Sequence, residues 1–197
     1  MHTVVGIALR MLGGPALALA SGMASAIAGS VPHASALPPP GFPNLDSFTA
    51  VPAEGYLGSG APGGAPRVSF SAGSALVCDF YGGPPPVPQP SQDIKCKGDM
   101  FGMDDVPFPG GRPRPGDCVV GSVDFKGPGY QLTRMSYAGC DGNPPSLPAG
   151  GKALGSGQKL TYLNVTCAVG PDALVACLDT TSGDHGFVVQ RSGSWAF

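Results

Sequence analysis

Apolar and polar residues alternate over short runs along most of the chain from residue 67 to residue 197. Such alternation puts every second side chain on one face and is typical of strands buried on one side. Glycine and proline bound the runs, and no segment keeps a helical apolar period over any length. The predicted strands are residues 68–70, 75–81, 94–97, 118–125, 130–138, 159–168, 173–179, 186–190 and 194–197. We expect an all-β fold, a small disulfide-stabilised sandwich or barrel of about nine short strands with long Pro/Gly-rich loops.

Two of the predicted loops are long, residues 82–92 and 98–115, and both are rich in proline and glycine. Loops held on a rigid scaffold often carry binding contacts, so these are the first surfaces on which to look for a ligand. In the second loop, Phe101 and Phe108 are candidate anchors for a partner.

The first 36 residues have the pattern of a signal peptide. Residues 11–27 carry no charge, and Ala34-Ser35-Ala36 supplies the small residues that signal peptidase requires before the cut. We predict cleavage between Ala36 and Leu37, with a cut after Ala26 as the alternative. An uncleaved membrane anchor is a further alternative, but the run up to residue 32 is only weakly apolar for that role. We expect a secreted, extracellular protein, free or associated with the cell wall, with no stable membrane insertion after cleavage.

Residues 37–66 contain seven prolines and six glycines in thirty positions. Proline removes amide donors and glycine disfavours regular structure, so this segment is predicted to be a Pro/Gly-rich arm or linker. A short helical turn capped by Asn44 is expected within it. The predicted organisation is therefore a signal peptide (1–36), the arm (37–66) and a β domain (67–197).

The chain is poor in charge. Only 12% of its 197 residues are charged, and the formal net charge is −2. Binding to a phosphate backbone requires clustered lysine and arginine, so no nucleic-acid partner is expected.

Six cysteines follow the predicted signal peptide: Cys78, Cys96, Cys118, Cys140, Cys167 and Cys177. An even number of cysteines in an exported chain predicts disulfides, although six cysteines allow about 15 connectivities. The predicted hairpins favour Cys167–Cys177 across the turn at residues 170–172, and Cys118–Cys140 at the open end of the hairpin turned by residues 126–129. Cys78 and Cys96 are then left as the third predicted pair. A cysteine metal site would need closer spacing, so no metal is predicted.

Three segments carry a resemblance to a known family. They are residues 70–78, which lead from Phe70 to the first cysteine, residues 147–150 (Leu-Pro-Ala-Gly), and the closing Thr166-Cys167, Cys177 and Asp184-His185-Gly186-Phe187. This pattern resembles an uncharacterised family of small six-cysteine secreted actinobacterial proteins, a domain of unknown function. The chain departs from it at residues 72–75 and at Asp184, where the family has glycine. The resemblance implies the fold and export, and it implies no activity.

Candidate catalytic chemistry is sparse. Only His185 remains after cleavage of the signal peptide, which argues against a zinc hydrolase. Ser182, Asp184 and His185 lie close in sequence, but neighbouring residues of an extended chain point to opposite faces. The acids Asp99, Asp104 and Asp105 are interpreted as a solvated loop. We assign no catalytic residue and no cofactor.

These observations predict a secreted binding or interaction module for an envelope or extracellular ligand of unknown identity. The alternatives are a secreted hydrolase that uses His185 and a purely structural envelope component.

Overall fold

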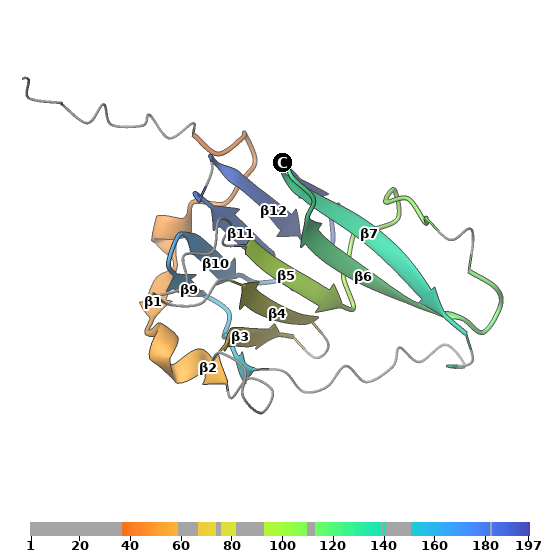
Figure 1. Ribbon diagram of the computed structural model, residues 1–197, viewed down its shortest axis with the longest axis horizontal. Coiled ribbons are helices and arrows are strands. Elements are labelled where there is room, and N and C mark those ends of the chain that lie inside the picture. The colour runs from red at the N-terminus through yellow and green to blue at the C-terminus, as the bar shows by residue number, and fades with distance from the viewer. Residues whose placement is uncertain are drawn as a thin grey trace, which may run out of the picture. The chain divides into compact units, whose positions relative to one another are not determined.

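The computed structural model describes residues 37–58, 67–73, 76–81, 93–109, 113–138, 140, 151–181 and 183–197. In this part of the chain, two β-sheets face each other and no α-helix is present, so the predicted all-β, sandwich-like fold is confirmed (Figure 1). The sheets do not close into a barrel. The predicted signal peptide (1–36), residue Ala36 of the cleavage site, the loop 82–92 and Ser182 lie outside the described residues.

The first sheet, here called sheet I, has the strand order β1-β9-β10-β11-β12-β13. Its strands are β1 (Thr49–Val51), β9 (Gln158–Tyr162), β10 (Val165–Val169), β11 (Val175–Asp179), β12 (His185–Val189) and β13 (Trp195–Ala196). The second, sheet II, has the order β2-β3-β4-β5-β6-β7, with β8 also paired to β3. Its strands are β2 (Leu57–Gly58), β3 (Arg67–Ala72), β4 (Leu76–Tyr81), β5 (Asp93–Gly98), β6 (Cys118–Phe125), β7 (Tyr130–Tyr137) and β8 (Lys152–Ala153).

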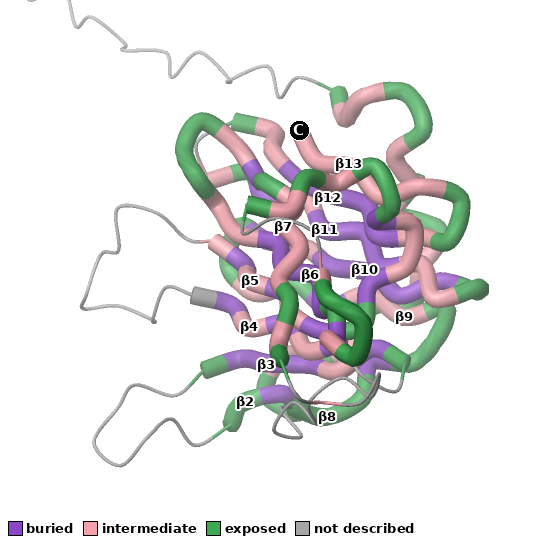
Figure 2. The backbone as a smooth tube through the Cα atoms, turned by 90° about the vertical axis from the view of Figure 1, so that its right-hand side faces the viewer, coloured by how far each residue is buried: buried purple, intermediate pink, exposed green. Residues whose placement is uncertain are grey.

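The core lies between the two sheets. Strands β10, β11 and β12 of sheet I are buried along most of their length, whereas β5 of sheet II alternates between buried and intermediate residues (Figure 2). The largest fully buried side chains of the core include Phe70, Phe80, Ile94, Leu160 and Phe187. Phe80 of sheet II meets Tyr162 of sheet I edge to face, with ring centroids 6.0 Å apart. Aromatic pairs of this geometry add about 0.5–1.5 kcal/mol to the stabilisation from burial, so this contact helps to hold the sheets together.

The described part contains thirteen strands where the sequence predicted about nine. Three of the extra strands, β1, β2 and β8, have only two or three residues and no alternation of their own to reveal them. The fourth arises because the predicted strand 159–168 is wrong: it is two strands, β9 and β10, with a turn at residues 163–164. Leu163 has a φ of 53° there, a left-handed conformation that ends the strand, and its side chain is half exposed rather than on the core face.

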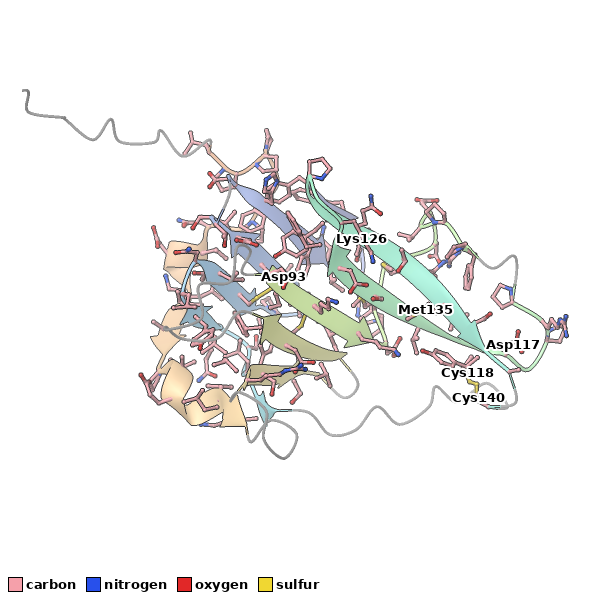
Figure 3. The ribbon with its side chains drawn as sticks, viewed as in Figure 1. Asp93, Asp117, Cys118, Lys126, Met135 and Cys140 are labelled. Carbon is pink, nitrogen blue, oxygen red and sulfur yellow. A yellow bond between two sulfur atoms is a disulfide. The ribbon has the colours of Figure 1, made fainter. Side chains whose placement is uncertain are left out.

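All six cysteines form disulfides in the three predicted pairs, two of them favoured by the hairpins and the third, Cys78–Cys96, the pair that was left. Cys78–Cys96 joins β4 to β5, and Cys167–Cys177 joins β10 to β11; in both pairs the cysteines stand directly opposite each other and are fully buried. Cys118–Cys140 closes the far end of the β6–β7 hairpin (Figure 3). Disulfides persist in oxidising surroundings, so the framework indicates an oxidising, extracellular environment.

The two sheets repeat one arrangement. Each contains five consecutive antiparallel strands, β3–β7 in sheet II and β9–β13 in sheet I, with a disulfide between the second and third. The strand pairing matches residue by residue. In sheet II the row through the disulfide is Phe70, Cys78, Cys96, Val123 and Leu132. In sheet I the corresponding row is Leu160, Cys167, Cys177, Phe187 and Ala196.

Each half also gives a short strand to the other. β1 precedes the first half along the chain, but it pairs in parallel with β9 of the second half. β8 precedes the second half, but it pairs in parallel with β3 of the first. Val51 and Lys152 occupy equivalent places, opposite Leu160 and Phe70. The chain therefore has an internal two-fold repeat in which the leading strands are exchanged.

The described part of the predicted arm, residues 37–58, lies on the β domain. It forms two short 3-10 helices, η1 (Leu45–Ser47) and η2 (Ala53–Tyr56), besides β1 and β2. As predicted, Asn44 caps the first turn: its side-chain oxygen accepts a hydrogen bond of 3.0 Å from the Asp46 amide. Phe42 packs edge to face on Phe197, with ring centroids 5.6 Å apart.

The arm covers the outer face of sheet I. Ala168, Ala176 and Val188 alternate with residues of the core, so their side chains point away from sheet II. All three are nevertheless completely buried. The arm is thus a third layer on this side of the sandwich.

The β6–β7 hairpin is much longer than its counterpart in sheet I. β6 and β7 have eight residues each, whereas β12 has five and β13 has two. The hairpin consequently projects beyond the sandwich (Figure 1). The loop after β5 covers part of its inner face: the Arg134 Nε donates a 3.0 Å hydrogen bond to the Val106 carbonyl, and its guanidinium lies 4.5 Å from the centre of the Phe108 ring.

Candidate functional site

A buried polar cluster lies between the sheets, near the turn of the β6–β7 hairpin. The Tyr130 hydroxyl on β7 donates a 2.7 Å hydrogen bond to Asp179 Oδ2 on β11, and it accepts one of 3.2 Å from the Ile94 amide on β5. The other carboxylate oxygen of Asp179 accepts from the Thr181 amide at 2.9 Å. Asp179 is only 3% exposed. The cluster therefore links sheet II to sheet I, and the Tyr130 hydroxyl and the Asp179 carboxylate already have hydrogen-bond partners within the protein.

The electrostatics of this cluster favour a structural role. Burial and the neighbouring Asp179 carboxylate both raise the pKa of Tyr130 far above its ordinary value, so the phenol stays protonated and remains a donor. Burial also raises the pKa of Asp93; the ammonium of Lys95 opposes this rise, and the Asp179 charge adds to it. A tyrosine held in its neutral form and bonded on both sides is not available as a base.

His185 stands opposite Asp179 in the β11–β12 pairing, but it is not arranged as a catalytic base. Its ring meets the edge of Phe125, with centroids 6.0 Å apart. Within the described ranges, it makes no hydrogen bond to a serine, a cysteine or a carboxylate. Asp184 precedes it in a bend, outside β12, and Ser182 lies outside those ranges. The described residues thus supply no nucleophile for a hydrolase that uses His185.

The loop predicted as a binding surface, 98–115, is described for residues 98–109 and 113–115. Both of its predicted anchors contact arginines of this chain: Arg134 covers Phe108, and the Arg191 guanidinium lies 4.0 Å from the centre of the Phe101 ring. Asp99 and Asp104 line a shallow hollow of about 440 Å³ that Arg134 also borders. In the part of the chain that the structure describes, no three His, Cys, Asp or Glu side chains are grouped to hold a metal ion.

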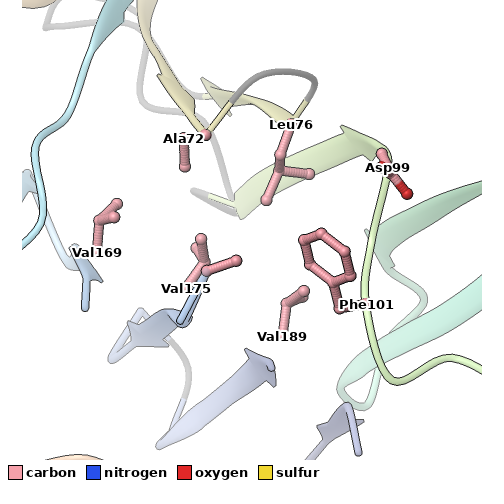
Figure 4. Close-up of a pocket in the computed structure, with 9 residues that line it drawn as sticks. Ala72, Leu76, Asp99, Phe101, Val169, Val175 and Val189 are labelled. Carbon is pink, nitrogen blue, oxygen red and sulfur yellow. The ribbon is translucent and has the colours of Figure 1, made fainter. Parts of the chain in front are cut away.

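A small cavity lies between the two sheets, at the end where a turn connects β10 to β11 (Figure 4). Its volume is about 40 Å³, and Leu76, Val175 and Val189 point into it, with Phe101 at one side. Ligand sites usually enclose about 300–1,000 Å³ and offer polar groups, so this cavity is a gap in the packing and not a binding site.

A larger groove runs between the arm and the outer face of sheet I, and we call it the arm groove. Its volume is about 640 Å³, and it is lined by Leu37, Pro38, Phe42, Pro43, Asn44, Leu45, Asp46, Lys159, Thr161, Thr166 and Leu178. The arm supplies an apolar wall of proline, phenylalanine and leucine. Strands β9, β10 and β11 supply the floor.

The floor of the arm groove is largely polar, and the groove as a whole carries no net charge. The Thr161 and Thr166 hydroxyls lie 2.9 Å apart across β9 and β10. The Lys159 ammonium forms a 3.4 Å ion pair with Asp46 of the arm. Sequence reasoning missed this site because its two sides are more than a hundred residues apart in the chain. The one sequence signal was the polar alternation at Lys159 and Thr161, which shows an outward face and says nothing of what lies beside it.

Comparison with protein-family models, with curated proteins and with solved structures finds no match. None of the helices in the described ranges has the length and the apolar character needed to cross a membrane.

Proposed function

We propose that the protein is a secreted binding module that holds an elongated, uncharged ligand of the cell envelope in its arm groove. The groove is the observation that carries this proposal. Its volume falls within the usual range of ligand sites, and it joins an apolar wall to a hydroxyl-bearing floor. In this proposal residues 1–36 direct export and are removed between Ala36 and Leu37. The resemblance to small secreted six-cysteine proteins is consistent with this.

The chemistry of the groove favours a neutral sugar chain. A sugar ring offers C–H faces that pack against proline and phenylalanine and hydroxyls that bond to polar side chains. Phe42 and Pro43 can pack against the C–H faces, and Thr161 and Thr166 can form hydrogen bonds with the sugar hydroxyls. Because Lys159 and Asp46 neutralise each other, no excess charge selects for an ionic ligand. A neutral envelope polysaccharide is therefore the ligand class that we propose.

Binding can be tested with the mature domain, starting at Leu37, and defined sugar probes. We would titrate an N-acetylglucosamine tetramer and a neutral glucan hexamer, with a sulfated hexasaccharide as the charged comparison, and follow backbone amide NMR shifts. The expected result is shifts at residues 159–166 and 42–46 for a neutral probe. Shifts confined to other surfaces, or no shifts at millimolar probe, would rule out the groove as a glycan site.

Two variants make the test specific. Thr161→Val/Thr166→Val keeps the shape of the floor but removes both hydroxyls, and we expect at least about a tenfold loss of affinity because two polar contacts are lost. Ser71→Ala is the control, a hydroxyl on the outer face of sheet II, because its neighbours Phe70 and Ala72 belong to the core. Equal affinities of the two variants would contradict the proposed floor.

Export has its own test. Intact mass and N-terminal sequencing of material from the culture medium should show Leu37 as the first residue. A first residue of Ile27 would indicate the alternative cut after Ala26, and Met1 would exclude cleavage.

A further inference from the structure

One of the sheet edges differs from the others. Sheet I ends in β1 and β13, which have three and two residues. One side of sheet II ends in β2 and β8, which have two residues each. The other side ends in β7, which has eight. Proteins usually shorten or block sheet edges because the unpaired backbone groups of an edge bind other strands. β7 is the edge that has not been shortened.

The strand register shows which backbone groups of β7 are free to pair. The Lys126 amide donates to the Gly129 carbonyl at 2.9 Å, which makes this the hydrogen-bonded pair that closes the hairpin turn. Hydrogen-bonded and non-bonded pairs alternate along antiparallel strands. Gln131, Thr133, Met135 and Tyr137 therefore bond to β6, whereas Leu132, Arg134 and Ser136 direct their N–H and C=O groups away from it.

These outward groups have no backbone partner among the described residues. β7 pairs with β6 alone, and no loop in the described ranges donates to or accepts from the backbone of Leu132, Arg134 or Ser136. Among the described residues of the loop after β5, the Val106 carbonyl accepts a hydrogen bond from the Arg134 side chain of β7, not from the β7 backbone.

The edge has few of the devices that prevent pairing, and an inward-pointing charge at Arg134 is the one on β7 itself. β7 contains no proline and no lysine, and Arg134 is its one charged residue. The guanidinium of Arg134 is already engaged by the Val106 carbonyl and the Phe108 ring. The side chains on its outer face, Gln131, Thr133 and Met135, are uncharged.

We propose that β7 pairs antiparallel with β7 of a second copy, about a two-fold axis at Thr133. In this register Leu132 lies opposite Arg134 of the second copy, and both of these residues present outward N–H and C=O groups. The arginines are not opposite each other, and Thr133 faces Thr133, a favourable cross-strand pair. The two copies of sheet II become one continuous sheet. A register centred on Arg134 would oppose two like charges and is disfavoured for that reason.

Sedimentation equilibrium of the mature domain in low salt measures the pairing. Protein concentrations of about 1 to 200 µM bracket the dissociation constant expected for a small, weak interface. We expect a monomer–dimer equilibrium with a dissociation constant of about 10–100 µM. An apparent molecular mass equal to that of the monomer at every protein concentration overturns the proposal. The groove of the proposed function lies on the other sheet, so this outcome leaves the binding test unaffected.

A charge swap at the axis identifies the surface. Thr133→Lys places two ammonium groups opposite each other, and Thr133→Glu places two carboxylates, so each variant alone should be monomeric. Their mixture should regain the dimer, because opposite charges then face across the axis. We expect each variant to fold because the Thr133 side chain points outward. A far-UV circular dichroism spectrum identical to that of the unmodified protein verifies this. A dimer that survives Thr133→Lys, or a mixture that stays monomeric, rules out self-pairing of β7 in this register.

Hydrogen exchange gives a second readout. The amides of Leu132 and Arg134 should exchange about two- to sixfold more slowly at 200 µM than at 1 µM, because the expected dissociation constant lies between these concentrations and exchange proceeds through the remaining monomer. The amides of Thr133 and Met135, which bond to β6, should be protected at both concentrations and serve as internal controls. Protection of Leu132 and Arg134 that does not change with concentration would contradict the proposed partner.

Discussion

Replacement of Tyr130 by phenylalanine tests the polar link between the sheets. The change removes one oxygen atom and keeps the ring, which packs against Phe125 and Phe187. Asp179 then loses the donor to Oδ2, and the fully buried Ile94 amide loses its acceptor. A hydrogen bond to a charged group contributes about 1.5–3 kcal/mol, and a buried amide left unpaired costs about 1 kcal/mol or more.

We therefore expect Tyr130→Phe to lower the free energy of unfolding by about 3 kcal/mol. In a domain of this size the melting temperature should fall by about 6–12 °C. Urea denaturation followed by circular dichroism measures the change, and the slope with denaturant should be unchanged because the same surface is exposed on unfolding. Tyr137→Phe is the matched control: its ring packs under the Lys97 ammonium, 5.3 Å from the ring centre, and we expect it to cost less than about 0.5 kcal/mol.

A double-mutant cycle separates the charge from the hydroxyl. Without its donor, the Asp179 carboxylate is a buried and poorly compensated charge, so Asp179→Asn should cost less in the Tyr130→Phe background than in the unmodified protein. We expect a coupling free energy of about 1–2 kcal/mol. A Tyr130→Phe variant within about 1 kcal/mol of the unmodified protein, or a cycle with no coupling, would refute the reasoning.

Three further changes follow from the same structure. Cys167→Ala/Cys177→Ala should cost about 4 kcal/mol in chemical denaturation, because it removes a cross-link and two fully buried sulfur atoms. Gly102→Ala should cost at least about 2 kcal/mol and expose the loop after β5 to proteolysis. Gly102 has a φ of 61°, and a Cβ there would overlap the backbone of Gln190 and Gly193. Asp93→Asn should raise stability at pH 7: burial raises the pKa of Asp93, so folding penalises the carboxylate at neutral pH, and this penalty disappears as the pH falls toward the unfolded pKa of about 3.9. Urea denaturation should show a higher free energy of unfolding for Asp93→Asn than for the unmodified protein at pH 7, and no such gain at pH 4.

The sequence predicts the features that depend on neighbouring residues. The alternation of apolar residues locates the longer strands, and the turn signals bring Cys167 opposite Cys177 because both lie at equal distances from Asp172. Asn44 caps its turn through a side chain that reaches only two residues ahead. In each case the interaction lies within one hairpin or one turn.

The features that depend on distant contacts could not be predicted. β1 and β8 are strands only because β9 and β3 present free edges to them, and their two or three residues carry no pattern of their own. The turn after Tyr162 was missed because leucine is an uncommon residue at a positive φ. The arm groove depends on where the arm lies on sheet I, which its proline and glycine content does not reveal.

The exchange of leading strands has a consequence for how the chain can be divided. No disulfide connects the two halves: two bridges lie before residue 141, and the third joins residues after 166. A cut between Cys140 and Lys152 would therefore give two separate polypeptides. Each would still hold a strand of the other's sheet, and both would share one apolar core. The halves should thus reassociate from separate solutions into the complete fold, which makes this protein a natural starting point for a split reporter.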